Sequence, residues 1–482
     1  MTHNENPAVA RRKFLKSAAV AGACTAAAAV GVNALAPIID PEKSAFEPNT
    51  SYWARALPSI NPPLAQNIHP DVAIIGGGFT GLAAAYYIRS QSPSKKVALL
   101  EASRCGNGAS GRNGAMMLTL TDDRYMVFRS DMSLDKQIYD LTVDNAARLK
   151  KIAASVSSVA PDPEIETSGA LQVLNTISDV EDGKRYVAKA NEVGIPVEFW
   201  DVEKTASLVG TRAYPGALFD PNSGQVHPGK LVAVLKAAAE STGAEIFENS
   251  AVVKIEEGPT HKITTAAGFT VTAPSLVLAT NAYTSKLGYL RRAVSPVFDY
   301  VGITAPLSDS HLADIGWQKP IPFNDSRTEV YYLGLTRDQR IHIGGGPVDY
   351  VFNNGVIEPK STAHHFARLS AELARIFPKL DGVPFETTWG GCVDMSLDQS
   401  PSVGVMGKHK NIFYAIGFSG HGVGLTSVFA RIVADLELRK TADWSWLPFV
   451  NRLPPYIPNE PFRWLGIHSA LAYYRATDAK TP

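Results

Sequence analysis

The sequence predicts an α/β fold with an α+β insert. Segments from both ends of the chain form one parallel sheet, and the antiparallel part is inserted between them in the sequence. Three observations predict this fold class. Asp71–Ile75 is a short apolar run, rich in β-branched residues, that leads into clustered glycines and an alanine-rich segment. Asn411–Gly424 repeats the order of apolar run and glycine-rich turn near the other end. Residues 290–350 alternate apolar and polar side chains over short runs, which is typical of antiparallel strands.

The first glycine cluster predicts a Rossmann-like turn between a strand and a helix. Gly76, Gly78 and Gly81 have the spacing G-x-G-x-x-G, and a helix is expected from Leu82 to about Arg89. The first glycine allows a tight turn, the second lets a pyrophosphate approach the backbone, and the third lets helix and strand pack closely. The free N–H groups at the helix N-terminus favour phosphate binding. The sequence therefore predicts a dinucleotide site, with a ligand-free glycine-rich turn as the alternative.

An acidic residue completes this pattern. Val97–Leu100 reads as the second strand, and Glu101 follows it, twenty residues after Gly81. A carboxylate there would accept hydrogen bonds from the ribose hydroxyls and disfavours a ligand with a 2′-phosphate. The motif alone does not separate FAD from NAD.

Length and composition narrow the class of protein. The chain has 482 residues, which predicts two domains or one domain with a large insertion. Lys+Arg and Asp+Glu are balanced at 46 each, so no nucleic-acid partner is expected. The three cysteines do not have the spacing of a metal site, so no metal is expected. The sequence alone does not decide whether Cys105 and Cys392 form a disulfide.

The N-terminus predicts a twin-arginine signal. Paired arginines at 11 and 12 precede Phe14-Leu15-Lys16, and a mildly apolar run follows from Ser17 to Leu35. We therefore expect the folded, cofactor-loaded protein to meet the twin-arginine export machinery and to be periplasmic or exported. An uncleaved leader could keep it membrane-associated, because Pro37 follows the small-x-small stretch that ends at residue 36. A soluble amphipathic helix or a transmembrane anchor are the alternatives.

The remaining pattern predicts alternating helices and strands in two domains. We expect helices over Leu134–Val159, 179–193, Leu231–Ser241, His364–Phe377 and Leu425–Leu438, and strands over Ser168–Leu174, Val197–Trp200, Ala244–Phe247, Ala251–Glu256, His261–Thr265, Thr270–Thr272 and Ser275–Ala282. The predicted parts are a leader (1–40), an arm (41–70), a nucleotide-binding domain (71–130, 220–290 and 386–440), a substrate domain (131–219 and 291–385) and a C-terminal tail (441–482).

Five ordered motifs resemble a known family. They are Asp71–Gly81, Glu101, the loop Gly108–Gly114 (GASGRNG), the strand Leu276–Asn281 and the turn Gly417–Val423. Together they are similar to the FAD-dependent amine and D-amino-acid oxidoreductases, such as glycine oxidase, sarcosine oxidase and D-amino-acid dehydrogenase. The loop resembles most the γ-glutamylputrescine oxidoreductase-like proteins. The resemblance implies FAD, bound by a Rossmann-like domain from both chain ends, and an antiparallel-sheet substrate domain.

The resemblance also implies roles for single residues. The glycine motif would hold the pyrophosphate, the loop would lie along the ribityl chain and flavin, and the last turn would present N–H groups to the pyrimidine edge. A helix that begins there would stabilise negative charge on the reduced flavin. The implied cofactor-binding residues are Gly76, Gly78, Gly81, Glu101, Ser110, Gly111, Arg112, Asn113, Val253, Thr280, Asn281, Gly420, His421, Gly422 and Val423.

The expected chemistry is oxidation of the C–N bond of a small-molecule amine or amino acid, by hydride transfer to flavin N5. The resulting imine would hydrolyse. His421, Arg112 and Tyr332 are the candidate catalytic residues. Each has a plainer alternative: a structural histidine, an arginine that anchors the loop, and a core aromatic. The electron acceptor would be oxygen or a membrane quinone.

One position departs from the resemblance. Relatives often carry an arginine where Gly334 stands, and an arginine over the flavin would bind a substrate carboxylate. Arg327 and Arg340 are nearby substitutes, although solvated strand-end charges are the simpler interpretation.

Three other functions stay open on the sequence alone. They are a flavin dehydrogenase of a 2-hydroxy acid, a nicotinamide-dependent enzyme, and a non-catalytic flavoprotein that assists maturation of another exported protein.

Overall fold

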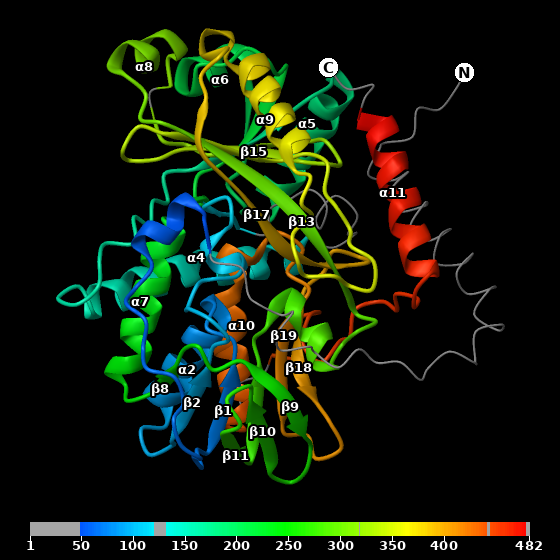
Figure 1. Cartoon of the computed structure of the whole chain (residues 1–482). Coiled ribbons are helices and arrows are strands. Elements are labelled where there is room, and N and C mark those ends of the chain that lie inside the picture. Colours follow the sequence, from blue (N-terminus) through cyan, green and yellow to red (C-terminus); the bar gives the residue numbers. More distant parts are fainter. Residues whose placement is uncertain (1–48, 120–131, 318, 441–443, 479–482) are drawn as a thin grey trace.

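The computed structural model describes residues 49–119, 132–317, 319–440 and 444–478. Two large sheets dominate the structure, one in the lower half of Figure 1 and one in the upper half. The predicted leader, residues 1–40, lies outside the described residues, as does part of the predicted arm.

The first sheet joins both ends of the chain. Strand β1 (Val72–Ile75) pairs in parallel with β2 (Val97–Leu100) and with β12 (Ser275–Leu278). Strand β19 (Ile412–Ile416) then pairs in parallel with β12, which confirms that a late segment completes the early nucleotide-binding unit. The full order is β18-β19-β12-β1-β2-β8, where β18 is Ser402–Met406 and β8 is Glu245–Phe247.

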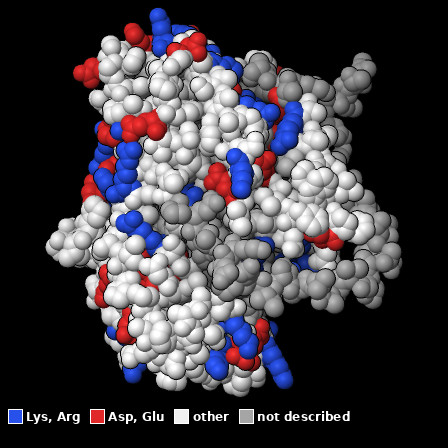
Figure 2. Space-filling model, viewed as in Figure 1, with Lys and Arg blue, Asp and Glu red and all other residues white. Residues whose placement is uncertain are grey.

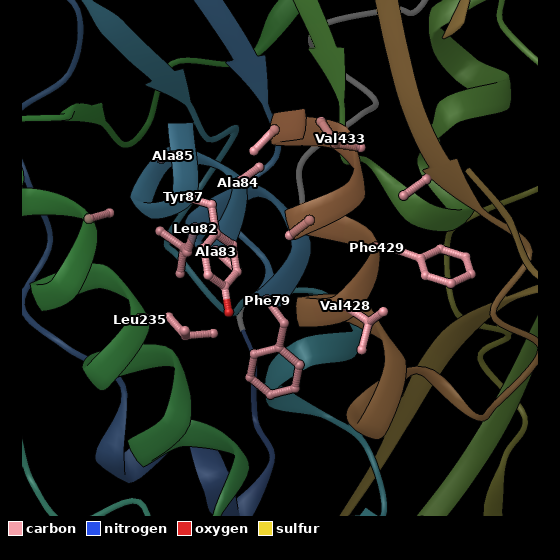
Figure 3. Close-up of a cluster of buried hydrophobic side chains, with 14 of the residues drawn as sticks. Phe79, Leu82, Ala83, Ala84, Ala85, Tyr87, Leu235, Val428, Phe429 and Val433 are labelled. Atoms are coloured by element: carbon pink, nitrogen blue, oxygen red, sulfur yellow. The ribbon is translucent and has the colours of Figure 1, made fainter. Parts of the chain in front are cut away.

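Both faces of this sheet are covered. All four residues of β1 are buried, and they alternate between two hydrophobic cores. One core holds helices α2 (Phe79–Gln91), α7 (Pro228–Ser241) and α10 (Gly422–Glu437). Figure 3 shows Leu82 and Tyr87 of α2 on the side that faces Leu235 of α7, whereas Phe429 points to the other side of α10.

The other core lies under a small antiparallel sheet. This sheet consists of β9 (Val252–Glu256), β10 (His261–Thr265) and β11 (Thr270–Ala273). Burial on both faces explains why β1 is apolar throughout rather than alternating.

The second sheet has eight strands in the order β17-β13-β16-β15-β14-β4-β6-β5. Neighbours run antiparallel except β14 and β4, which are parallel. This agrees with the antiparallel sheet predicted over residues 290–350. The strands are β17 (Phe385–Ser396), β13 (Val294–Thr304), β16 (Ile341–Gly345), β15 (Tyr331–Leu335), β14 (Phe323–Asp325), β4 (Ala170–Leu174), β6 (Gly216–Asp220) and β5 (Glu198–Asp201).

Helices α5, α6, α8 and α9 belong to this upper half (Figure 1). They span Ile177–Glu192, Val202–Val209, Asp309–Ile315 and Ala363–Ile376. The short elements near the site are η2 (Tyr52–Ala56), η3 (Ala109–Gly111), β3 (Met116–Met117), β7 (Gly224–Gln225) and η4 (Asn281–Leu287), and η5 is Pro378–Leu380.

Two predicted domain assignments need correction, and one helix was not predicted. Strand β17 was placed in the nucleotide-binding part from residue 386, but it pairs along β13 in the second sheet. Helix α4 (Ser133–Ser155) was placed in the substrate domain, but its apolar stripe packs with α7 and α10 in the core of the first sheet. The tail contains a helix that was not predicted, α11 (Phe462–Asp478), seen in red along the side of Figure 1.

The surface carries mixed charge. On the face in Figure 2, basic and acidic side chains are interspersed. Among the described helices, none has both the length and the apolar character needed to cross a membrane.

Candidate active site

A cavity of about 390 Å³ adjoins both sheets. The loop after β2 and the first turn of α10 contribute lining residues from the nucleotide-binding half. Strands β13, β15 and β17 contribute from the second sheet, and α11 adds side chains from the C-terminus. Of the predicted site residues, those that line it are Ser110, Arg112, Asn113, Asn281, Tyr332, Gly420, His421, Gly422 and Val423.

The glycine motif lies beside the cavity and is packed too tightly for side chains. Gly76 has φ +109°, and a Cβ there would lie 2.5 Å from the Ala279 carbonyl oxygen. A Cβ on Gly81 would lie 1.9 Å from the Gly76 carbonyl oxygen. Gly78 precedes α2 without any side-chain cap. The strand–turn–helix geometry expected for a bound pyrophosphate is therefore present.

Glu101 is held at the end of β2 by backbone groups. Its Oε2 accepts from Gly77 N at 2.7 Å and its Oε1 from Ser103 N at 3.0 Å. Burial raises the pKa of this carboxyl. Its position beside the glycine turn is the one that the ribose role requires.

Two more predicted residues lie near this motif. Thr280 follows Ala279, which packs on Gly76, and its Oγ1 lies 2.8 Å from Thr284 Oγ1. Val253 sits where the register of β9 against β10 shifts. A residue at such a bulge keeps backbone groups outside the ladder, which suits the predicted backbone contact with adenine.

Three aromatic rings hold the loop that follows η3. Trp389 Nε1 donates to the Arg112 carbonyl at 2.8 Å, and Trp53 Nε1 donates to the Asn113 carbonyl at 2.9 Å. His342 Nε2 lies 3.0 Å from the Gly114 carbonyl, and since a carbonyl only accepts, this nitrogen carries the proton. The rings come from β17, η2 and β16, so three distant segments fix three consecutive carbonyls. We call Trp53, His342 and Trp389 the loop clamp.

Sequence reasoning missed the loop clamp. Burial lowers the pKa of His342 to about 4, which keeps the ring neutral. A tryptophan in the arm and one in a long strand gave no local signal of a shared partner, because their contacts join residues far apart in the chain.

The same loop is tied to α2 and to the arm. Ser110 Oγ accepts from Phe79 N at 2.9 Å, at the N-terminus of α2. The Gly111 carbonyl accepts from Asn49 Nδ2 at 2.9 Å and from Ser51 Oγ at 2.6 Å. Gly111 is buried behind the loop rather than lining the cavity, so the structure places it as a packing residue.

Arg112 joins the loop to the second sheet. Its Nε donates to the Asn107 carbonyl at 2.8 Å and its Nη1 to the Gly390 carbonyl at 3.0 Å. Arg112 lines the cavity, so a contact with flavin stays a prediction, and the observed bonds agree with the anchoring alternative.

A buried aspartate organises the turn before α10. Asp394 Oδ2 accepts from Gly417 N at 2.5 Å, and Oδ1 accepts from Asn281 Nδ2 at 3.2 Å. Burial raises the pKa of Asp394 to about 7. This side chain therefore joins β17 to the two turns that follow β12 and β19.

The turn itself opens toward the cavity. Gly420 has φ +92°, and no atom lies within 4 Å of the position a Cβ would take. His421 is the N-cap of α10 and makes no side-chain cap. The N–H groups of the first turn are thus not capped by that side chain, which suits an electronegative ligand edge.

Tyr332 lies between the loop and the second sheet. Its hydroxyl donates to Asp299 Oδ2 at 2.7 Å. A Cβ on Gly114 would lie 2.2 Å from the ring, and one on Gly344 would lie 2.3 Å from the hydroxyl. Two glycines therefore make room for this ring. The ring of the neighbouring Tyr331 instead lies 4.3 Å from the Arg327 guanidinium.

The position of the missing arginine is closed. A Cβ on Gly334 would lie 2.3 Å from His342 Cε1, so an arginine there would displace the loop clamp. Arg327 pairs with Asp325 and Glu372, and Arg340 pairs with Asp338 at 2.7 Å and with Glu386. Both guanidinium groups are ion-paired and largely buried rather than solvated, and neither lines the cavity.

Helix α11 closes one side of the cavity. Ile467, Ala470, Leu471 and Tyr474 line it. Asp478 anchors the end of α11, because it accepts from the backbone N–H groups of residues 328 and 329 at 3.1 and 2.7 Å. These lining residues were missed because the segment was expected to be an irregular tail.

The residues present fit FAD. Glu101 contacts the glycine turn, Ser110 joins the start of α2 to the loop, and the loop and the first turn of α10 line the cavity. Cys105 and Cys392 are both free thiols, so they form no disulfide. Within the described residues, no group of three or more His, Cys, Asp and Glu could hold a metal ion.

Comparisons with known proteins agree on the family. A family profile described as FAD dependent oxidoreductase matches residues 71–436. The chain is 30% identical over 394 residues to a Haemophilus influenzae protein described as "Probable oxidoreductase OrdL". The aligned region covers 78% of this chain and 85% of that protein. It is 29% identical to the γ-glutamylputrescine oxidoreductase of Escherichia coli, over 86% of this chain and 93% of that protein.

A solved structure shows the same fold. Glycine oxidase from Geobacillus kaustophilus superposes with a TM-score of 0.68 at 22% identity, over 80% of this chain and 98% of that one. At this identity the likeness concerns the fold alone.

Proposed function

Because the chain belongs to the family of FAD-dependent oxidoreductases that act on amines and amino acids, we propose that it oxidises a C–N single bond. FAD would accept a hydride at N5 from the carbon next to nitrogen, and the imine product would hydrolyse. The observation that carries this proposal is the cavity of about 390 Å³ between the loop Gly108–Gly114, the start of α10 and the second sheet. We call this segment the flavin loop, because it would lie along the flavin.

The protein's part in this reaction is positioning and charge stabilisation. The loop clamp fixes the carbonyls of residues 112–114, which holds the loop in one conformation beside the cavity. The first turn of α10 would face the electron-rich edge of the flavin, where its N–H groups and dipole favour negative charge. His421 at that turn and Arg112 on the loop stay candidates for contact with flavin or substrate.

Aromatic and aliphatic side chains form much of the cavity wall. Leu471 and Tyr474 of α11 close one side, and Val297 and Val301 of β13 form part of another. Such apolar walls would strengthen electrostatic interactions between a substrate and the groups around it, which suits hydride transfer.

The charges of the cavity favour an amine over a 2-hydroxy acid. Arg112 is the one arginine or lysine among the described lining residues, and backbone carbonyls hold its guanidinium. A hydroxy acid would need a cation for its carboxylate.

Anaerobic reduction of the holoenzyme tests the proposal. Oxidised protein is mixed with primary amines, N-methyl amines, D- and L-amino acids and 2-hydroxy acids, and the visible flavin absorbance is followed. We expect bleaching by at least one amine or amino acid and none by the hydroxy acids. Bleaching by hydroxy acids alone would overturn the proposal, as would dithionite-reducible flavin that no amine or amino acid reduces.

We also propose oxygen or a membrane quinone as the electron acceptor. The rate of flavin reoxidation in aerated buffer, compared with the rate in anaerobic buffer with a soluble quinone, distinguishes the two.

We further propose export by the twin-arginine route, on the strength of the paired arginines at 11 and 12. Replacing both with lysine should leave the folded, yellow protein in the cytoplasm. An unchanged distribution between cytoplasm and periplasm would refute export by this route.

A further inference from the structure

Asp299 is a carboxylate on a mainly apolar sheet face. Every second residue of β13 from Ser295 to Val301 lines the cavity, so Asp299 lies between Val297 and Val301 on that face. On β17 it pairs with Gly391, which carries no side chain over the carboxylate.

Neutral donors fix this carboxylate. The Tyr332 hydroxyl donates a hydrogen bond to Oδ2 at 2.7 Å, and Tyr300 N donates to Oδ1 at 2.9 Å. The backbone N–H of Gly345 is a third donor to this carboxyl. Burial raises the pKa of Asp299. A carboxylate in an apolar wall is costly unless something compensates its charge, and all three of these donors are uncharged.

The other carboxylates that line the cavity have different partners. Asp394 accepts from Gly417 N and from the Asn281 amide. Glu329 lies 3.5 Å from Arg475 Nε of α11, which gives it a cation already. Asp299 is thus the lining carboxylate placed to receive a cation from the cavity.

Its location is next to the flavin loop. The Tyr332 ring that holds Asp299 packs against Gly114, whose carbonyl belongs to the clamped loop. A cation bound to Asp299 therefore lies at the loop end of the cavity, beside the residues that would hold the flavin.

We propose that Asp299, oriented by Tyr332, binds the substrate's amino group in its ammonium form and accepts the proton that this nitrogen must lose before the hydride leaves the neighbouring carbon, and that the substrate is an amine without a carboxylate beside the reacting nitrogen. This inference rests on the proposed function for calling the ligand a substrate. It narrows the substrate class from amines and amino acids to amines, and it assigns the residue that recognises them.

Three probes of one shape test the charge preference without turnover. tert-Butylammonium has no hydrogen on the carbon next to nitrogen, so it cannot donate a hydride. tert-Butanol and trimethylacetate are its neutral and anionic counterparts. We titrate each into the oxidised holoenzyme and follow the flavin absorbance and the heat of binding.

The wild-type protein should bind tert-butylammonium about tenfold or more tightly than tert-butanol, because a charge-assisted hydrogen bond is stronger than a neutral one. Trimethylacetate should bind most weakly. Trimethylacetate that binds as tightly as the ammonium, or an ammonium that does not bind, would overturn the proposal without any variant.

Matched variants assign the effect to the residue. Asp299→Asn should reduce the preference for the ammonium to within about threefold, with flavin content unchanged. Asp349→Asn is the control, because that carboxylate contacts Tyr300 Oη and His365 and does not line the cavity. Tyr332→Phe should weaken ammonium binding but leave tert-butanol binding unchanged.

The outcomes separate this inference from the proposed function. An ammonium preference that Asp299→Asn abolishes, in a protein whose flavin no amine reduces, would support the binding site and refute the proposed oxidation. Flavin reduction by amines with an Asp299→Asn variant that keeps the wild-type preference would refute the binding site alone.

Discussion

Single glycines decide whether the nucleotide-binding turn can form. A Cβ on Gly81 would lie 1.9 Å from the Gly76 carbonyl oxygen. Because this oxygen belongs to the backbone, the clash cannot be relieved by rotation of a side chain. We expect Gly81→Ala to destabilise the protein by about 3 kcal/mol and to prevent FAD binding. Urea unfolding and flavin content after purification measure the two effects.

The matched control is another helical glycine. Gly466 lies in α11 with no atom within 4 Å of a Cβ. Gly466→Ala should leave stability unchanged or raise it by up to about 1 kcal/mol, since alanine favours helix. Equal losses in both variants would contradict the packing argument.

The buried histidine of the loop clamp makes stability depend on pH. Burial lowers the pKa of His342 from 6.5 to about 4, so between these values the unfolded chain binds the proton and the folded protein does not. The contribution of the neutral His342 ring to the free energy of unfolding is therefore fully present above pH 6.5 and is lost as the pH falls toward 4. Between pH 7 and pH 5 the loss from this residue should be about 2 kcal/mol.

Urea unfolding at both pH values isolates this residue. His342→Gln keeps a donor for the Gly114 carbonyl but does not titrate. Between pH 7 and pH 5, the free energy of unfolding of this variant should therefore fall by about 2 kcal/mol less than that of the wild-type protein. His69→Gln, at an exposed position, should lose as much as the wild type. Identical losses in His342→Gln and wild type would show that His342 is not the cause.

The flavin loop depends on its ring donors as a unit. Trp53→Phe leaves the Asn113 carbonyl without its indole donor and keeps most of the packing. An unsatisfied buried acceptor costs about 1–3 kcal/mol, so the Kd for FAD should rise about tenfold or more. Trp389→Phe should act similarly through the Arg112 carbonyl.

Reconstitution of the apoprotein with FAD measures this Kd. Trp464→Phe, on the exposed side of α11, should bind FAD like the wild type. Equal affinities in all three variants would mean that the loop is held by other contacts.

Helix α11 is the element that shapes the substrate end of the cavity. Leu471 is buried and lines it, whereas Leu465 on the same helix is 58% exposed. Leu471→Ala should raise KM for the best amine about tenfold with unchanged flavin content, and Leu465→Ala should not. Steady-state kinetics on the two variants check this, and equal KM values would remove α11 from the substrate site.

Sequence reasoning predicted the elements whose signal is local. The strand–glycine–helix unit at Gly76–Gly81, the acid at Glu101 and its echo at Gly417–Gly424 each lie within a short stretch, and their types and order are confirmed. Helix α11 was not predicted because its apolar residues lie all around the helix and so give no clear helical period. The helix also follows directly after a proline-rich segment.

Long-range contacts explain what else could not be predicted. The loop clamp joins residues 53, 342 and 389 to three neighbouring carbonyls, and nothing in any of these local sequences indicates the others. Asp299 likewise read as one polar residue in an alternating strand. Only the pairing of β13 with β16 and β17 shows that it faces a cavity.

The whole molecule is organised so that a single cavity is shared between the nucleotide-binding half and the second sheet. The first sheet supplies the turns that fit FAD, and the second sheet and α11 supply the walls against which an amine would lie. In the proposed reaction, this cavity presents the C–H bond next to an amine nitrogen to the flavin.

An anaerobic single turnover with product analysis tests this claim most directly. Holoenzyme is reduced by the amine that bleaches it fastest, and released carbonyl product and ammonia, or the corresponding smaller amine, are measured against flavin reduced. We predict one equivalent of each per flavin, as hydrolysis of an imine requires. Flavin reduction without release of a nitrogen product would contradict C–N oxidation.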